Sequence, residues 1–177
     1  MNVYITLLRG INVGCKNKLP MKELIAILEE CGFAEIQTYI QSGNVVLRSK
    51  PIKCATAAST IGKAISKKFA FQPQVLMITA TDLKKAIENN PFPTDTGKAL
   101  HFYFLATQPK NPNLDKLESL RAESENFQLV DRVLYLHAPA GIGRSKLAAA
   151  IEKNLNAPTT ARNWNTVKKL AQMAGIL

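Results

Sequence analysis

The sequence predicts an α+β protein built from two ferredoxin-like subdomains, each a β-α-β-β-α-β unit whose antiparallel sheet carries helices on one face. Two observations predict this fold. Apolar runs of strand length and runs at helical spacing follow one another in that order within the first 80 residues, and the same order begins again at residue 100. The Pro-rich segment NNPFPTDTG lies between the two series. We therefore expect subdomains at residues 1–80 and 100–177, joined by a helix and linker at 81–99.

The first half is punctuated by glycine and proline. Its first strand is apolar on both alternations, which is typical of a central strand covered on both faces. A Gly-rich basic loop, GINVGCKNK, follows, and Pro20 then opens a helix that Gly32 ends. Ser42-Gly43 predicts a hairpin turn. The expected elements are strands at 2–9, 35–40, 44–49 and 75–79 and helices at 20–31 and 58–69.

The second half repeats this order of elements without a repeat at the level of residues. Its final strand, APTTAR, is short and leads at once into an extra C-terminal helix that carries Trp164 and Leu170. The expected elements are a connecting helix at 81–88, strands at 100–106, 127–130, 133–137 and 157–162, and helices at 114–122 and 145–154.

Composition excludes several classes of protein. Of 177 residues 46% are apolar, so a packed core is available and disorder of the whole chain is excluded. The longest charge-free stretch, residues 69–81, is far shorter than the roughly 20 residues that cross a membrane. Residues 1–8 are too short for a signal peptide, so we expect a cytoplasmic protein without membrane partners. The oligomeric state is left open.

Cysteine and histidine give no sign of a metal or cofactor. Cys15, Cys31 and Cys54 form no C-x-x-C pair and have no neighbouring histidine, so neither a zinc site nor a redox pair is expected. His101 and His137 fall on strands expected to be neighbours, which permits a cross-strand pair; two unrelated sheet histidines are the commoner arrangement.

The net charge of +10 is concentrated in loops. Four segments, 9–18, 40–48, 139–146 and 157–169, contain nine Lys and Arg and no Asp or Glu. In an antiparallel sheet of this topology the first two segments share one sheet end, and the last two share one end of the second sheet. If the halves pack antiparallel, all four would line one cleft. The candidate ligand-binding residues are Arg9, Asn12, Lys16, Lys18, Gln41, Asn44, Arg144, Ser145, Lys146, Arg162 and Asn163.

Such loops suit an anion. Glycines let the backbone turn its N–H groups outward, and Ser145 opens a helix whose first amides are unpaired. The alternative is that the glycines make ordinary turns, that Ser145 and either Asn163 or Asn165 are helix caps, and that Trp164 is core. The stretch Gly-Ile-Gly-Arg-Ser-Lys lacks the spacing of a P-loop, and no Asp follows a strand to hold magnesium. A nucleoside triphosphatase is therefore not expected.

Three classes of function remain. The first is a binding protein for a phosphate-bearing ligand, a nucleotide or nucleic acid, held by Arg and Lys charge and by backbone amides. The second is an enzyme acting on a small anionic metabolite with Lys16, Lys18 or Lys146 as base or Schiff-base residue. The third is a protein interaction module. Whether the chain is an enzyme is left open, because fold does not determine activity.

Four motifs also resemble a known family. LLRGINVGCKNKLPM, TYIQSGNVVL, GIGRSKL and TTARNWNTVKKL, in this order and over nearly the whole chain, resemble the bacterial family known as domain of unknown function 1697 (DUF1697). One departure is Cys15, where members often have a second glycine. The resemblance implies an α/β protein with ferredoxin-like subdomains. It implies no activity, cofactor or catalytic residue.

Overall fold

The computed structural model describes all residues, 1–177, and divides into two compact units. Unit 1 comprises Met1–Lys85 together with Lys168–Leu177, and unit 2 comprises Ala86–Val167. The boundaries fall inside two helices, α3 (Ala80–Glu88) and α6 (Trp164–Met173). No helix is both long enough and apolar enough to cross a membrane.

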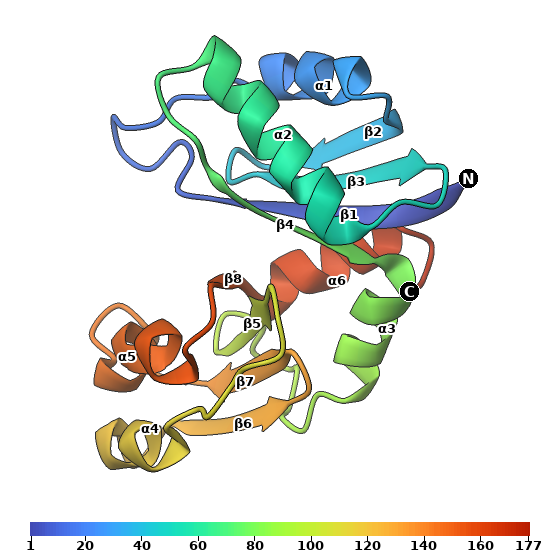
Figure 1. Cartoon of the computed structure of the whole chain (residues 1–177). Helices are drawn as coiled ribbons and strands as arrows, with labels where there is room; N and C mark the ends of the chain where they lie inside the picture. Colours follow the sequence, from blue (N-terminus) through green and yellow to red (C-terminus); the bar gives the residue numbers. More distant parts are fainter. The chain divides into compact units, whose positions relative to one another are not determined.

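Unit 1 is a four-stranded antiparallel sheet in the order β2-β3-β1-β4, with α1 and α2 on one face (Figure 1). Its core between sheet and helices contains Leu8 of β1, Leu47 of β3, Leu28 of α1 and Ile61 of α2. The elements are β1 (Asn2–Arg9), α1 (Met21–Glu30), β2 (Ala34–Tyr39), β3 (Asn44–Ser49), α2 (Cys54–Lys68) and β4 (Gln74–Thr79). The predicted central strand is confirmed, because all residues of β1 from Tyr4 to Leu8 are buried.

Unit 2 repeats the arrangement with the sheet order β6-β7-β5-β8. Its core contains Leu105, Leu134, Leu117 and Leu147, one from each of β5, β7, α4 and α5. The elements are β5 (Leu100–Leu105), α4 (Leu114–Leu120), β6 (Asn126–Val130), β7 (Val133–His137), α5 (Lys146–Leu155) and β8 (Thr159–Asn163). The α+β fold with two ferredoxin-like subdomains is confirmed.

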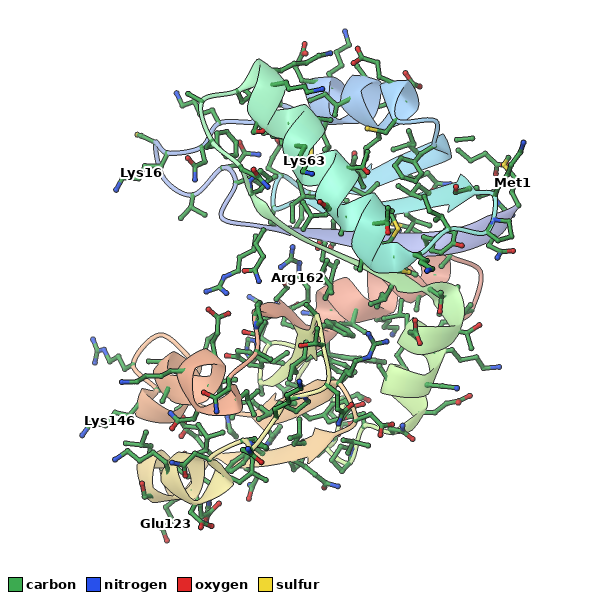
Figure 2. The ribbon with its side chains drawn as sticks, in the orientation of Figure 1. Met1, Lys16, Lys63, Glu123, Lys146 and Arg162 are labelled. Carbon is green, nitrogen blue, oxygen red and sulfur yellow. The ribbon has the colours of Figure 1, made fainter.

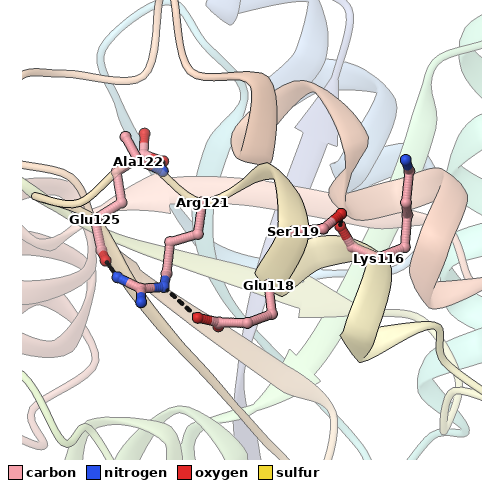
Figure 3. Close-up of polar contacts among 6 residues, drawn as sticks. All are labelled: Lys116, Glu118, Ser119, Arg121, Ala122 and Glu125. Atoms are coloured by element: carbon pink, nitrogen blue, oxygen red, sulfur yellow. Dashed lines mark hydrogen bonds and ion pairs between the residues drawn. The ribbon is translucent and has the colours of Figure 1, made fainter.

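Polar contacts fasten the end of α4, which finishes two residues earlier than predicted. Arg121 Nε donates to Glu118 Oε1 at 2.7 Å, and Arg121 Nη1 donates to the carbonyl oxygen of Glu125 at 2.7 Å (Figure 3). The Glu125 carboxylate in turn accepts from the backbone N–H of Ala122 at 2.9 Å. Because the Ala122 N–H bonds to this carboxylate and not to the carbonyl oxygen of Glu118 four residues earlier, the helical bonding pattern stops before Ala122 and the chain turns into β6.

The two sheets can be aligned residue by residue. Tyr4 in β1 lies opposite Leu47 in β3 and Thr79 in β4, and His101 in β5 lies opposite Leu136 in β7 and Asn163 in β8. The polar residues that end the fourth strands also correspond: Thr79 Oγ1 accepts from Asp82 N, and Asn163 Oδ1 accepts from Thr166 N. The duplication that is invisible in the sequence is thus present in the register, and it makes Tyr4 and His101 equivalent positions.

The grouping of the chain differs from the expected segments in two places. Residues 86–99 cluster with unit 2, and residues 168–177 cluster with unit 1 although the sequence places them in the second half. Leu170 and Ala171 of this last segment are almost completely buried. The C-terminal helix α6 therefore begins in unit 2 and ends in unit 1, and its apolar residues beyond Val167 cluster with unit 1.

The cross-strand histidine pair that the sequence permitted does not form, and the commoner arrangement of two unpaired sheet histidines is present. His137 lies opposite Leu100, and His101 lies opposite Leu136. Adjacent residues on a strand point to opposite faces, so the two imidazoles lie on opposite sides of the sheet. His137 stacks against Phe92 with ring centroids 6.0 Å apart, whereas His101 shares the helix-bearing face with Tyr103.

Candidate functional site: two sets of basic loops

The loop between β1 and α1 is held by its own asparagines. Asn12 Nδ2 donates to the carbonyl oxygens of Leu19 and Gln41 at 2.9 and 2.8 Å, and Asn12 Oδ1 accepts from Leu19 N at 2.8 Å. Asn17 Nδ2 donates to the carbonyl oxygen of Gly10 at 2.8 Å. Asn12 and Asn17 both have a positive φ of 52°, a conformation that asparagine tolerates better than most residues. The loop is therefore preorganised.

The β2–β3 turn lies against this loop, as predicted. Gly43 accepts from Leu8 N through its carbonyl oxygen at 2.8 Å, and the Asn12 side chain bonds to Gln41. Asn44 is fully buried and its Nδ2 donates to Tyr39 and Ser42, so its amide has a structural role within the turn. We call residues 10–18 and 40–43 together the loop pair.

Two apolar side chains of the loop pair face solvent. Val13 is 66% exposed and Ile40 is 53% exposed, although most large apolar residues of the chain are buried. Ile40 also has φ of 49°, which a β-branched residue rarely adopts. Backbone strain of this kind costs about 1–3 kcal/mol and concentrates at functional sites. Sequence reasoning missed both residues; an apolar residue between Asn12 and Gly14 in a polar loop was the available signal.

The cations of the loop pair are on its surface. Lys16 and Lys18 are exposed, and Lys16 projects from the outer side of the loop (Figure 2). Arg9 is exposed at the end of β1, and its Nη1 donates to Gln74 Oε1 at 3.2 Å. Gln41 is exposed as well. Arg48, the remaining cation of these segments, lies outside the loop pair and forms an ion pair with Glu35 at 2.8 Å.

In unit 2, the loop at residues 138–145 and the end of β8 share one sheet end, also as predicted. The register shows this, because Leu100 lies opposite His137 and the next residue, His101, lies opposite Asn163. Ser145 is the N-cap of α5, and its Oγ accepts from Ala148 N at 2.9 Å.

The polar residues of this second set are divided between structural and exposed roles. Ser145 and Asn163 are helix caps, as the alternative interpretation expected. Arg144 and Lys146 are exposed, and Lys146 points away from the start of α5 (Figure 2). Each set of loops belongs to its own unit, and the predicted cleft joining them stays a prediction.

Arg162 is the cation with the most unusual surroundings. It lies opposite Phe102 on the sheet face away from the helices, and its Nη1 donates to the carbonyl oxygen of Ala161 at 2.8 Å. Burial lowers the pKa of Arg162 to about 10, because desolvation penalises the charged form. The group is still a full cation at neutral pH. Trp164 stacks on Phe102 with centroids 5.9 Å apart, so it is partly core.

A separate groove lies between α1 and α2 and contains none of the predicted site residues. Its volume is about 530 Å³, and its walls include Glu30, Cys31, Lys63, Lys67 and Lys68. Lys68 forms an ion pair with Glu30 at 2.7 Å. Burial raises the pKa of the Cys31 thiol, which keeps it protonated and unreactive. The groove is mixed in charge, with Glu30 among Lys63, Lys67 and Lys68.

Comparison with known proteins gives the family of the chain. Residues 1–135 match the family described as "Protein of unknown function (DUF1697)". The chain belongs to the DUF1697 family. A conserved bacterial protein from Streptococcus pneumoniae has a similar structure, with a TM-score of 0.70, 24% sequence identity and 98% of each chain covered. No curated protein matches the chain.

The DUF1697 match covers one of the two sets of loops and not the other. It contains the loop pair of unit 1 and ends at Tyr135 in β7, before residues 138–146 and the end of β8. The streptococcal structure shows that the fold of this DUF1697 protein occurs over the full length of another chain. Neither comparison names an activity.

Proposed function

We propose that this protein binds a phosphate-bearing ligand, a nucleotide or nucleic acid, through the loop pair of unit 1. The observation that carries the proposal is the combination of exposed cations with an absence of acids: Lys16 and Lys18 are exposed, and residues 10–18 and 40–43 contain no Asp or Glu. Lysine ammonium groups attract phosphate as point charges, and an acid-free surface imposes no repulsion on it.

The rigidity of the loop pair supports the proposal. The side chains of Asn12 and Asn17 bond to backbone groups of the same unit, so the loop has little conformational freedom left to lose. Less entropy is then lost when a ligand binds, which leaves more of the interaction energy as affinity.

The exposed apolar side chains favour a ligand with both charged and apolar parts. Val13 is on the same loop as Lys16 and Lys18, and Ile40 is on the turn that lies against this loop. A nucleotide offers phosphate oxygens to Lys16 and Lys18 and the face of a base to the aliphatic side chains. A small inorganic anion would leave Val13 and Ile40 without a role.

The lysine-based enzyme and the interaction module are not favoured by a particular observation. A lysine that acts as a base or forms a Schiff base needs desolvation or neighbouring cations to lose its proton. Lys16, Lys18 and Lys146 are all exposed to solvent. The apolar residues of the loop pair are few and lie among cations, unlike the large apolar patch of a protein-binding surface.

Binding of fluorescently labelled single-stranded and duplex oligonucleotides, measured by anisotropy over a range of salt concentrations, tests the proposal. Affinity should fall with salt, with a log–log slope of about −0.9 for each phosphate neutralised on a duplex. The double variant Lys16→Ala/Lys18→Ala should weaken binding and make the slope shallower by about 2 on a duplex, because two phosphate contacts are lost.

The matched control removes an equal charge elsewhere on unit 1. The double variant Lys63→Ala/Lys67→Ala changes two exposed lysines of α2, far along the chain from the loop pair, and should keep nearly the full slope. Equal losses in both double variants would mean non-specific attraction by net charge. That result, or binding that does not respond to salt, would exclude the loop pair as the site.

A further inference from the structure

His101 contains a buried polar atom without a partner. The residue is only 9% exposed, and its Nε2 has no hydrogen-bond partner. The His101 side chain also forms a hydrogen bond with the backbone of Lys98. Since Nε2 has no partner, the other ring nitrogen, Nδ1, forms this bond. A carbonyl oxygen accepts, so Nδ1 carries the proton, and in the neutral ring Nε2 is a free acceptor. An unpaired buried acceptor costs free energy, which makes it a candidate ligand contact.

The equivalent residue of unit 1 shows where a side chain at this position points. Tyr4 occupies the same place in its sheet, and its hydroxyl accepts from the N–H of Ile52 at 3.2 Å. Ile52 belongs to the connection between β3 and α2. The corresponding connection in unit 2 is residues 138–145, between β7 and α5. By this correspondence the His101 side chain is directed toward residues 138–145. The N–H of Ala138, at the start of that connection, bonds to the carbonyl oxygen of Ala99, next to Lys98. In unit 1 the same connection supplies the donor that His101 Nε2 lacks.

The connection at residues 138–145 and the start of α5 contain backbone N–H groups without a hydrogen-bond partner. The N–H groups of Ala138, Gly141 and Ser145 donate to backbone carbonyl oxygens, and the N–H of Ala148 donates to Ser145 Oγ. The N–H groups of residues 143 and 144 and of the first two residues of α5 have none. Gly141 has φ of 84°, and the side chains of Arg144 and Lys146 are cationic and exposed. No acidic residue lies in the first turn of α5.

We propose that His101, the connection 138–145 and the first turn of α5 form a site for a terminal phosphate, inorganic phosphate or a phosphate monoester. The unpaired N–H groups and the helix dipole receive the negative oxygens, and Arg144 supplies charge from the rim. His101 Nε2 accepts the hydrogen bond of the one protonated phosphate oxygen. This site does not depend on the loop pair of unit 1.

The need for a donated proton distinguishes phosphate from other anions, because His101 Nε2 can only accept a hydrogen bond. A phosphate monoester loses its second proton at a pKa of about 6, so near neutral pH it can still carry a P–O–H group that donates. Sulfate has the same shape and charge but no proton to donate at neutral pH, and a phosphodiester has none either. Desolvation lowers the pKa of His101, which keeps the imidazole neutral and Nε2 an acceptor at neutral pH. The site should therefore prefer phosphate to sulfate.

The test titrates the full-length protein with inorganic phosphate, and separately with sulfate at equal ionic strength, while ¹H–¹⁵N spectra follow the amides of residues 143–147. Phosphate should shift these amides and sulfate should shift them less. His101→Phe should weaken phosphate binding roughly tenfold or more and abolish the preference, because the hydrogen bond to a charged ligand is lost. Arg144→Ala should weaken binding of both anions.

Controls keep the outcomes separate. Lys153→Ala removes a charge from the same helix at its other end and should leave the titration unchanged. If His101→Phe fails to fold, His101→Gln and Arg144→Ala carry the test; the Gln amide can donate, so that variant should bind sulfate as well as phosphate. Equal binding of both anions to the native protein, or no shift at residues 143–147, would overturn the proposal and leave a buried water as the partner of Nε2. Neither result would affect the loop pair.

Discussion

Gly43 lies where the β2–β3 turn passes over the end of β1. Its φ is 77°, and a Cβ atom at this position would stand 2.6 Å from Leu8 Cβ. Both the backbone conformation and the space exclude a side chain, since the left-handed region costs an L-residue about 1–2 kcal/mol and overpacking adds about 1–3 kcal/mol. The loop pair depends on this close approach.

We expect Gly43→Ala to lower the free energy of unfolding by about 2 to 4 kcal/mol, measured by urea denaturation followed by circular dichroism. Gly143→Ala is the matched control: no atom lies within 4 Å of its Cβ position and its φ is not positive, so its stability should change by less than about 0.5 kcal/mol. A tolerated Gly43→Ala would mean that the turn does not rest on β1.

At single positions, the sequence predicted the kind of residue or turn that is present but not which other residues it contacts. The dipeptide Ser42-Gly43 predicts a turn, but the contact of Gly43 with Leu8 depends on strand pairing across 35 residues of chain. Asn12 and Asn44 were expected to bind and orient the ligand, yet their side chains bond to the backbone. The exposure of Val13 and Ile40 likewise depends on how the whole unit packs, which local patterning does not specify.

At the scale of elements, helix caps are the clearest test of the two interpretations of the basic loops. Ser145 caps α5 through the bond from Ala148 N. We expect Ser145→Ala to cost about 1 kcal/mol of unfolding free energy, measured by thermal or urea denaturation. Ser119→Ala, which removes a hydroxyl from inside α4, should be nearly neutral because that hydroxyl only bonds to Lys116 O on the same helix (Figure 3).

Element types could be predicted because periodicity and punctuation are local. The strand 44–49 and the helix stop at Gly32, with φ of 86°, match the sequence pattern closely. The histidines show the limit of this reasoning: neighbouring strands were predicted, but a shift of one residue in register places His101 and His137 on opposite faces. Register follows from the packing of the whole sheet, so the sequence pattern alone did not determine it.

At the scale of the whole molecule, the last ten residues belong to the first unit although they follow the second unit in the sequence. Leu170 is 1% exposed and belongs to a segment that clusters with unit 1. The apolar spacing of α6 predicted a buried face but not which unit would cover it. No local pattern distinguishes a helix that packs on its own sheet from one that joins another unit.

Leu170→Ala should therefore destabilise unit 1. Removing a buried leucine costs about 2–5 kcal/mol. Amide hydrogen exchange should show faster exchange in β1 and β3, while β5 and β7 keep their protection. Lys169→Ala, an exposed neighbour, serves as control. Loss of protection confined to unit 2 would contradict the assignment of residues 168–177.

The stacking of Trp164 on Phe102 also decides what an optical experiment on this protein can see. Trp164 is the only tryptophan of the chain and belongs to unit 2. Its emission reports on the environment of that one ring pair, so fluorescence follows the melting of unit 2 and is nearly blind to unit 1. A single smooth fluorescence transition would then look like all-or-none unfolding even if unit 1 had already melted. Far-ultraviolet circular dichroism reports on the secondary structure of both units. Comparing its transition with the fluorescence transition therefore measures how cooperatively the two units unfold.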